Sequence, residues 1–154
     1  MKKVLLLLLV SISFSCSDSA KEKDDSAKQG TVKQGTVKQE EGEQELKKEI
    51  LQAAIDYEKL QWFYIDTTKL IVLKNEIVTE PLSLEKFGKN VVFLDSTELE
   101  NSAKNHYLVV EKLIIEDDSA HVGLRYPSQG AVANLSLLRA DDSWKVVWSE
   151  IFEN

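Results

Sequence analysis

Four short segments in the C-terminal part of the chain alternate apolar and polar residues with a period of two. They cover residues 107–115, 120–126, 131–138 and 144–152. This period is typical of β-strands that bury one face. The separating segments are short and rich in Asp, Ser, Pro and Gly, which are turn-forming residues. Because short connections join strands that run in opposite directions, the pattern predicts an antiparallel meander.

A single amphipathic helix is predicted before these strands. Apolar residues recur at steps of three and four over about twenty residues, which places them on one helical face. They are Leu46, Ile50, Ala53, Ala54, Tyr57, Leu60 and Tyr64. Asp66-Thr67-Thr68 is expected to end the helix.

Shorter elements are expected between the helix and the meander. Residues 69–77 and 91–94 are candidate strands, 82–87 is a short segment after Pro81, and 98–104 is a possible helical turn.

Together these elements predict an α+β fold, with one long N-terminal helix packed on a curved antiparallel sheet of about five or six strands. In the strand at 120–126, alternate residues point to opposite faces. Those expected to face the helix are Ala120, Val122, Leu124 and Tyr126, and those expected to point away are His121, Gly123 and Arg125.

The N-terminus has the layout of a bacterial export signal. Lys2 and Lys3 precede an apolar run over residues 4–14, which steps down to small residues before Cys16. The run is too short to cross a hydrocarbon core about 30 Å thick, which needs roughly 20 helical residues. We therefore expect residues 1–15 to be a cleaved signal peptide.

Cys16 is the only cysteine in the chain, and its position predicts lipid attachment. Ser13-Phe14-Ser15-Cys16 resembles the lipobox of bacterial lipoproteins, although Leu is more common than Ser13 in that motif and Phe14 is bulky. The resemblance implies a diacylglycerol thioether and acyl chains such as palmitate on Cys16. Ordinary signal peptidase could cut the same bond, so simple secretion is the alternative.

Residues 16–43 are expected to form a tether, and residues 44–154 one globular domain. The tether has few large apolar side chains and repeats Lys-Gln-Gly-Thr-Val at 28–32 and 33–37. Its acidic start resembles export tags of surface lipoproteins in Bacteroidota. The resemblance implies a bacterial cell envelope location, lipid-anchored in the outer membrane on its periplasmic or surface face.

The charge balance disfavours nucleic acid as a partner. The chain carries 19 basic and 26 acidic residues, for a formal net charge of −7. Phosphate backbones are bound by clustered Lys and Arg, whereas here the basic residues are scattered among acids. Contact with the membrane is therefore expected through the lipid alone.

Residues 112–148 resemble the last strands of cystatin-like and nuclear-transport-factor-2-like domains. The resemblance follows the strand order and the segment Asp141-Asp142-Ser143-Trp144-Lys145-Val146 before the final strand. It implies a cone formed by helix and sheet around an apolar cavity, which members of these families use for ligands, catalysis or partner docking. A shared fold carries no activity with it.

No catalytic, cofactor or metal site is predicted. The two histidines, His106 and His121, have no paired spacing for a metal, and the single cysteine is expected to be acylated. The pairs Asp117-Asp118 and Asp141-Asp142 lack the ligand ladder of a calcium loop and are interpreted as turns. Nucleotide and nucleophile motifs are absent from the sequence.

Three tryptophans raise the question of a ligand site. The alternation places Trp144, Val146 and Trp148 on one strand face, which favours a core role for them, and Trp62 near the helix end. If that face lines an open cavity, Tyr126, Trp148 and Glu150 would form a ligand-binding floor with one polar anchor.

The sequence thus favours a lipid-anchored, non-enzymatic binding or interaction domain with an unknown envelope protein or small ligand as partner. A small-ligand or hydrolytic pocket inside the cone is the alternative.

Overall fold

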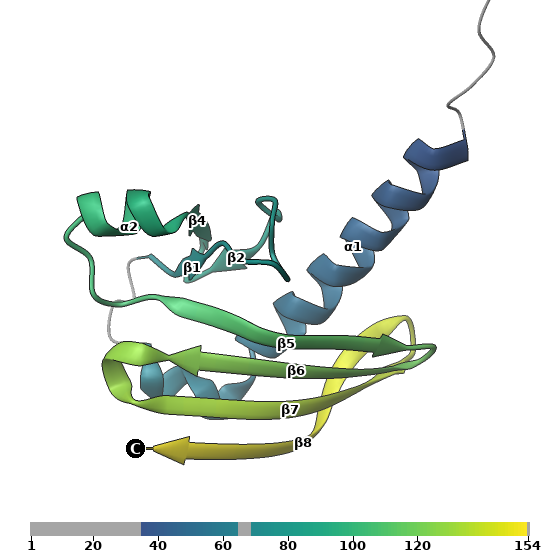
Figure 1. Ribbon diagram of the computed structural model, residues 1–154. Coiled ribbons are helices and arrows are strands. Elements are labelled where there is room, and N and C mark those ends of the chain that lie inside the picture. Colours follow the sequence, from purple (N-terminus) through teal and green to yellow (C-terminus); the bar gives the residue numbers. More distant parts are fainter. Residues whose placement is uncertain (1–34, 65–68, 154) are drawn as a thin grey trace, which may run out of the picture. The chain divides into compact units, whose positions relative to one another are not determined.

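The computed structural model describes residues 35–64 and 69–153, with side chains from residue 41 onward. Within these ranges the main element is a six-stranded sheet with strand order β4-β1-β5-β6-β7-β8 (Figure 1). The last four strands form the predicted antiparallel meander: β5 (Leu108–Glu116), β6 (Ser119–Tyr126), β7 (Ala131–Ala140) and β8 (Ser143–Glu153). The α+β class and the meander predicted by the alternation are confirmed.

The turns of the meander use residues that tolerate left-handed backbone. Asp117 has φ 46°, Asp141 and Asp142 have φ 52° and 58°, and Gly130 has φ 64° after the short 3₁₀ helix η2 (Pro127–Gln129). Asp and Gly occupy this region more readily than most residues. The two Asp pairs are therefore turn residues, as the sequence predicted.

The first strands of the sheet are parallel, so the prediction of a wholly antiparallel sheet is wrong. β1 (Ile71–Leu73) pairs in parallel with both β4 (Val92–Leu94) and β5. The physical reason lies in the connections. The β2–β3 hairpin (Glu85–Lys86 and Lys89–Asn90) lies between β1 and β4, and α2 (Ser96–Asn101) lies between β4 and β5. Such connections are long enough to cross back over the sheet and restart a strand in the same direction.

The helix begins and ends earlier than predicted. α1 (Gly35–Ile55) ends before Tyr64 and is followed by the 3₁₀ helix η1 (Glu58–Phe63). The prediction of one continuous helix to Tyr64 is wrong because apolar steps of three also suit a 3₁₀ turn. The apolar positions themselves are correct, since Leu60 and Tyr64 are buried like Ile50 and Ala54 of α1. The expected helix end at 66–68 lies outside the described residues.

The core lies between the meander on one side and α1 with the 3₁₀ helix η1 on the other. Ala120, Val122, Leu124 and Tyr126 of β6 are all at most 7 % exposed, as predicted. Their cross-strand partners on β7, which lie on the same face of the sheet, are Leu137, Leu135, Ala133 and Ala131, and these are buried too. The last turns of α1 supply Ile50, Leu51, Ala54 and Ile55 from the other side. We call this buried side of the meander the inner face.

The β2–β3 hairpin is held against α1 by hydrogen bonds. The Gln52 side chain receives a bond from the Glu85 amide and donates one to the Glu85 carbonyl, both at 2.9 Å. Its turn places Phe87 at φ 56° and Gly88 at φ 69°. The Phe87 ring packs edge-on to Tyr64 with centroids 5.7 Å apart, so the hairpin covers the C-terminal end of α1.

Candidate functional site

The space where the sequence predicted the cavity of a cone is almost completely filled. The space between η1 and the inner face is lined by apolar side chains, among them Leu60, Phe63, Tyr126 and Ile151, and its volume is about 10 Å³. That is room for about one water molecule. Pockets that bind small molecules measure about 300 to 1,000 Å³. The described residues therefore leave no preformed chamber for a ligand inside the cone.

The polar groups near this interior bond to the protein itself. The Tyr64 hydroxyl donates to the Ile55 carbonyl at 2.8 Å, and burial raises the pKa of that hydroxyl far above its ordinary value, with smaller contributions from Tyr126 and Asp56. The Tyr126 ring lies edge-on to Tyr64 with centroids 5.5 Å apart. Both tyrosines act as core residues, and the Tyr64 hydroxyl stays protonated.

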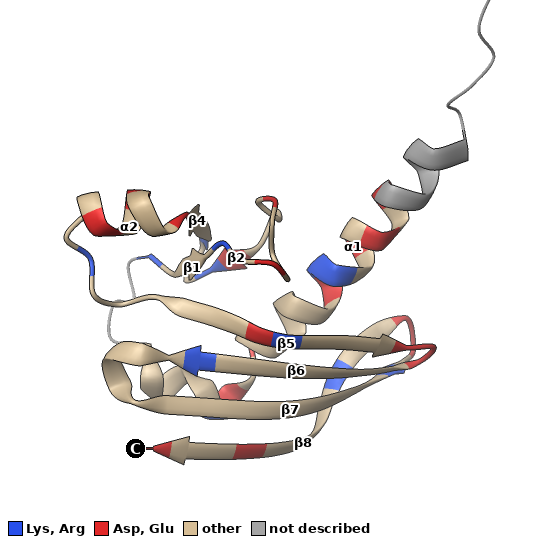
Figure 2. Cartoon of the chain, in the orientation of Figure 1, with Lys and Arg blue, Asp and Glu red and all other residues tan. Residues whose placement is uncertain are grey.

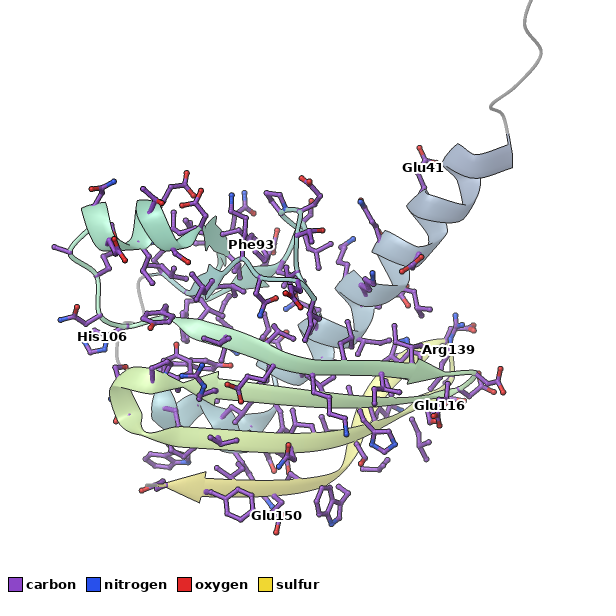
Figure 3. The ribbon with its side chains drawn as sticks, viewed as in Figure 1. Glu41, Phe93, His106, Glu116, Arg139 and Glu150 are labelled. Atoms are coloured by element: carbon purple, nitrogen blue, oxygen red, sulfur yellow. The ribbon has the colours of Figure 1, made fainter. Side chains whose placement is uncertain are left out.

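The structure does not bring the three predicted ligand residues together. Tyr126 lies on the inner face and is 7 % exposed, whereas Trp148 is 52 % exposed and Glu150 is exposed on the opposite side of the sheet. Figure 3 labels Glu150 on β8. A binding floor made of these residues would require one face, and they lie on two.

A β-bulge in β8 explains the difference. Leu137 pairs with Val146, but Ser136 pairs with Trp148, so Val147 is an extra residue in the strand. A bulge shifts the alternation by one residue. Trp144 and Val146 therefore face the core, while Trp148 points to solvent, and the expected shared face of Trp144 and Trp148 is wrong. The hydrogen bond of 2.9 Å between the Tyr57 hydroxyl and Ser149 Oγ confirms that the next residue faces the helices.

Both histidines are exposed and bonded to serines. His106 Nδ1 lies 3.0 Å from Ser128 Oγ, and His121 Nδ1 lies 3.1 Å from Ser136 Oγ. Within the described part of the chain no carboxylate bonds to either ring. A nucleophile needs a base that a third group orients, and here that group is missing from both pairs. Across residues 35–64 and 69–153 there is also no cluster of three metal-ligating side chains.

The most unusual surface is the uncovered side of the meander, which we call the outer face. Ribbon and cartoon views show α1 and η1 on the opposite side of β5–β8 (Figures 1 and 2). Five large apolar side chains on this surface are 41 to 57 % exposed: Ile114, Leu138, Val147, Trp148 and Phe152. The outer face is completed by Glu111, Lys112, Glu116, Ser119, His121, Gly123, Arg125, Val132, Asn134, Ser136, Lys145 and Glu150.

The strand register arranges the outer face in four rows that cross the meander from β5 to β8. The first row is Glu116, Ser119, Leu138 and Lys145, and the second is Ile114, His121, Ser136 and Trp148. The third row is Lys112, Gly123, Asn134 and Glu150. The fourth row is Val109, which is buried, with Arg125, Val132 and Phe152, and Glu111 from the bulge in β5 is paired to Arg125.

Charges of both signs accompany the apolar residues on this surface (Figure 2). Three cations, Lys112, Arg125 and Lys145, stand against three anions, Glu111, Glu116 and Glu150. Lys112, Glu116 and Glu150 make no ion pair with any described residue, whereas the Lys145 ammonium lies 3.9 Å from Asp141. The outer face is therefore electrically balanced in a chain whose formal net charge is −7.

Sequence reasoning missed the outer face as a site. Ile114, Val147 and Phe152 were expected only as strand residues, and the signal that could have found them is doubling of apolar residues. Leu113-Ile114-Ile115 and Val146-Val147 are apolar on consecutive positions, which a strand buried on one side does not need. Trp62, 89 % exposed on η1, is a separate exposed aromatic residue away from the outer face.

Cys16 and the expected tether as far as residue 34 lie outside the described residues, whereas residues 35–43 of that expected tether belong to α1. Among the residues that are described, no helix is long and apolar enough to span a membrane. Comparisons of the chain with protein-family models, with curated proteins and with solved structures found no match.

Proposed function

We propose that this chain is a lipid-anchored protein of a bacterial cell envelope whose domain is a non-enzymatic interaction module. Its interaction surface is the outer face. The anchor is a diacylglycerol thioether on Cys16, in the outer membrane on its periplasmic or surface face. Secretion without lipid is the alternative location.

The support for the anchor is the order of residues at the N-terminus. Two lysines, an apolar run and small residues lead directly to the only cysteine of the chain. Two or three acyl chains, each buried methylene contributing about 0.8 kcal/mol, hold a protein on a membrane without a spanning helix.

The observation that carries the interaction proposal is the exposure of five large apolar side chains on one sheet face, namely Ile114, Leu138, Val147, Trp148 and Phe152. Soluble monomers bury most residues of this kind, and a sheet face that exposes several of them together with charged residues is typical of a docking site. Tryptophan and phenylalanine are also enriched at protein interfaces. The alternative, a ligand or hydrolytic pocket inside the cone, gains no support from an interior volume of about 10 Å³.

We also propose a cystatin-like or nuclear-transport-factor-2-like ancestry for the domain. Its support is a helix packed against the inner face of a four-stranded meander. The parallel strands β1 and β4 would then be an addition at one edge of the sheet.

The anchor is tested by the intact mass of the protein isolated from membranes. We expect a product that begins at Cys16 and carries two or three acyl chains, and a Cys16→Ala variant that accumulates in the soluble fraction. An unmodified, soluble product from the unaltered gene would refute the anchor and leave the secreted alternative.

The interaction surface is tested by photo-crosslinking in cells. A photoreactive amino acid, p-benzoylphenylalanine, replaces Phe152 in one strain and Trp62 in a matched strain. Both positions are exposed aromatics, 45 % and 89 %, and only Phe152 lies on the outer face. We expect a protein adduct from position 152 and none from position 62. Equal yields, or no protein adduct from position 152, would refute the outer face as the interaction surface.

A further inference from the structure

We propose that the outer face binds a second copy of this chain, so that two domains pack sheet to sheet in a symmetric dimer. The inference rests on the proposed function, because it names the partner of the same surface. It follows from how the four rows would meet when the outer face is placed against itself.

The geometry is fixed by a two-fold axis parallel to the strands and midway between β6 and β7. Rotation about this axis places β5 of one copy opposite β8 of the other, and β6 opposite β7. Each row then lies opposite the same row of the second copy. Packed sheets cross at about 30° because each is twisted, so the two central rows remain closest and the outer rows diverge.

The charged residues become complementary in this arrangement. In the third row Lys112 on β5 faces Glu150 on β8 of the second copy, and two-fold symmetry makes the contact twice. In the first row Glu116 on β5 faces Lys145 on β8 in the same way. Neither Lys112, Glu116 nor Glu150 is paired to a described residue of its own chain, so each is available.

The apolar residues also meet in the central rows. In the second row Ile114 faces Trp148 of the second copy, and His121 faces Ser136. The exposed ring of Trp148 would be covered by an aliphatic side chain, which is the kind of contact that contributes most at interfaces.

An axis perpendicular to the strands gives a worse match. It would place the first row opposite the fourth, with Glu116 near Glu111 of the second copy, so that carboxylates of equal charge would approach each other. Like charges brought together at an interface disfavour association. The charge pattern therefore selects the axis that is parallel to the strands.

The balance of charge favours a second copy over a strongly charged partner. A strongly basic or acidic partner is matched by a surface of one opposite sign. The outer face instead carries three cations and three anions, while the whole chain has a formal net charge of −7. A surface with both signs in register across a two-fold axis complements itself.

The size of the outer face fits a reversible dimer. Four strands about 4.8 Å apart and four rows about 6.8 Å apart give a footprint of roughly 500 Å² on each copy. Two footprints cover about 1,000 Å², which is near the lower limit of specific interfaces. We therefore expect dissociation in the micromolar range, with the dimer favoured where the chain is concentrated on a membrane.

The test is a charge exchange between two copies. Full-length chains with two different epitope tags are expressed together, the membranes are solubilised, and one tag captures the other. Lys112→Glu paired with itself places Glu opposite Glu150 twice, and Glu150→Lys paired with itself places Lys opposite Lys112 twice. We expect co-capture in each of these cells to fall about tenfold or more, since like charges oppose each other at both contacts.

Mixing the two variants restores both contacts. When one copy carries Lys112→Glu and the other Glu150→Lys, each altered residue faces its opposite charge, and the unaltered pair is also opposite in sign. We expect co-capture close to that of the unaltered pair. This rescue requires the two-fold arrangement, and a merely misfolded variant would not produce it.

Matched controls distinguish an effect at the outer face from the general effect of changing a surface charge or removing an exposed tryptophan. Lys89→Glu makes the same charge change on the exposed β3, and Trp62→Ala removes an exposed tryptophan on η1. We expect both to leave co-capture unchanged, whereas Trp148→Ala lowers it. Far-ultraviolet circular dichroism and the melting temperature of each variant confirm that it is folded.

The possible outcomes are distinct. Co-capture that does not respond to Lys112→Glu or Glu150→Lys, or that is not restored by mixing them, overturns the dimer. If the photo-crosslink at position 152 then yields an adduct of another mass, the interaction module stands and its partner is a different protein. If position 152 yields no protein adduct either, the proposed function fails as well.

Discussion

At the scale of single residues, Lys86 is the most informative side chain. It is 7 % exposed, and its ammonium donates to the Ile55 carbonyl at 3.0 Å and to Asp56 Oδ1 at 2.8 Å. It also lies over the rings of Tyr64 and Phe87, at 5.1 and 5.4 Å from their centroids. A cation at the C-terminal end of α1 satisfies a terminal carbonyl and interacts favourably with the negative end of the helix dipole. Lys86 therefore caps the C-terminal end of α1, together with the Tyr64 hydroxyl that donates to the same carbonyl.

Removing this charge tests that role. Lys86→Met keeps the length of the side chain and loses the ammonium, and we expect a loss of about 2 kcal/mol in the free energy of unfolding, from the dipole and cation–π contributions together. Asp56→Asn is the matched control. Because Asp56 is half exposed, the ion pair alone should contribute less than about 1 kcal/mol. Urea denaturation measures the free energy of unfolding of both variants. Equal losses in the two variants would show that Lys86 acts only through Asp56.

Tyr64 gives a prediction for alkaline pH. Its ordinary pKa is 10.0, and burial raises the pKa in the folded state. Below about pH 10 the hydroxyl is protonated in both the folded and the unfolded state, so its contribution to the free energy of unfolding is fully present. Above it the unfolded state releases a proton that the folded state retains, which favours unfolding.

The Tyr64→Phe variant isolates this effect. At neutral pH it should lose about 1 kcal/mol, since one hydrogen bond to Ile55 is removed while that of Lys86 remains. Above pH 10 the stability of the unaltered protein should fall more steeply than that of the variant. Unfolding curves from pH 8 to pH 11 measure the difference, and two parallel pH profiles would contradict it.

At the scale of elements, the bulge at Val147 decides which tryptophan belongs to the core. Trp144 before it is 6 % exposed and Trp148 after it is 52 % exposed. Trp144→Ala should therefore cost about 3 to 5 kcal/mol. Trp148→Ala should cost less than about 1 kcal/mol in the monomer, as for other surface positions.

These two variants are compared by urea denaturation at nanomolar concentration, where the dimer is dissociated. Trp144→Phe is a useful control, because the Trp144 indole nitrogen is buried without a described hydrogen-bond partner. Its removal leaves no partner unsatisfied, so Phe should retain most of the stability that Ala loses. Losses of similar size for Trp148→Ala and Trp144→Ala would mean that both side chains face the core and that β8 continues without a bulge.

The same elements show what could be predicted from sequence. The strands of the meander and the buried side of β6 followed from a period of two, because the connecting turns are short and chemically distinct. The parallel direction of β1 and β4 could not be predicted in this way, because alternation identifies a strand but not the strand with which it pairs. Lys86 contacts the end of α1. The bulge in β8 is defined by its pairing with β7. Such contacts join residues far apart in the chain, and local patterns do not record them.

The predicted site failed for a related reason. Tyr126, Trp148 and Glu150 were grouped by counting alternate residues, and one extra residue in β8 was enough to separate them onto two faces. The absence of catalytic motifs from the sequence led to an interaction domain as the preferred function. The location of that interaction could only be found once the uncovered sheet face was known.

At the scale of the whole molecule, an acidic chain presents one electrically balanced and apolar face. Its net charge of −7 keeps copies apart in general, whereas the outer face offers a place where two copies can meet in register. A lipid anchor would confine the chains to a surface and raise their local concentration, so that a weak dimer becomes populated.

The most direct test of the outer face is a fluorine NMR dilution series on the protein labelled with 5-fluorotryptophan. The chain has three tryptophans, and single Trp→Phe variants assign the three resonances. We expect the Trp148 resonance to shift as the concentration rises through the micromolar range, while the buried Trp144 and the exposed Trp62 stay fixed. Three resonances that remain fixed, or a shift confined to Trp62, would contradict self-association through the outer face.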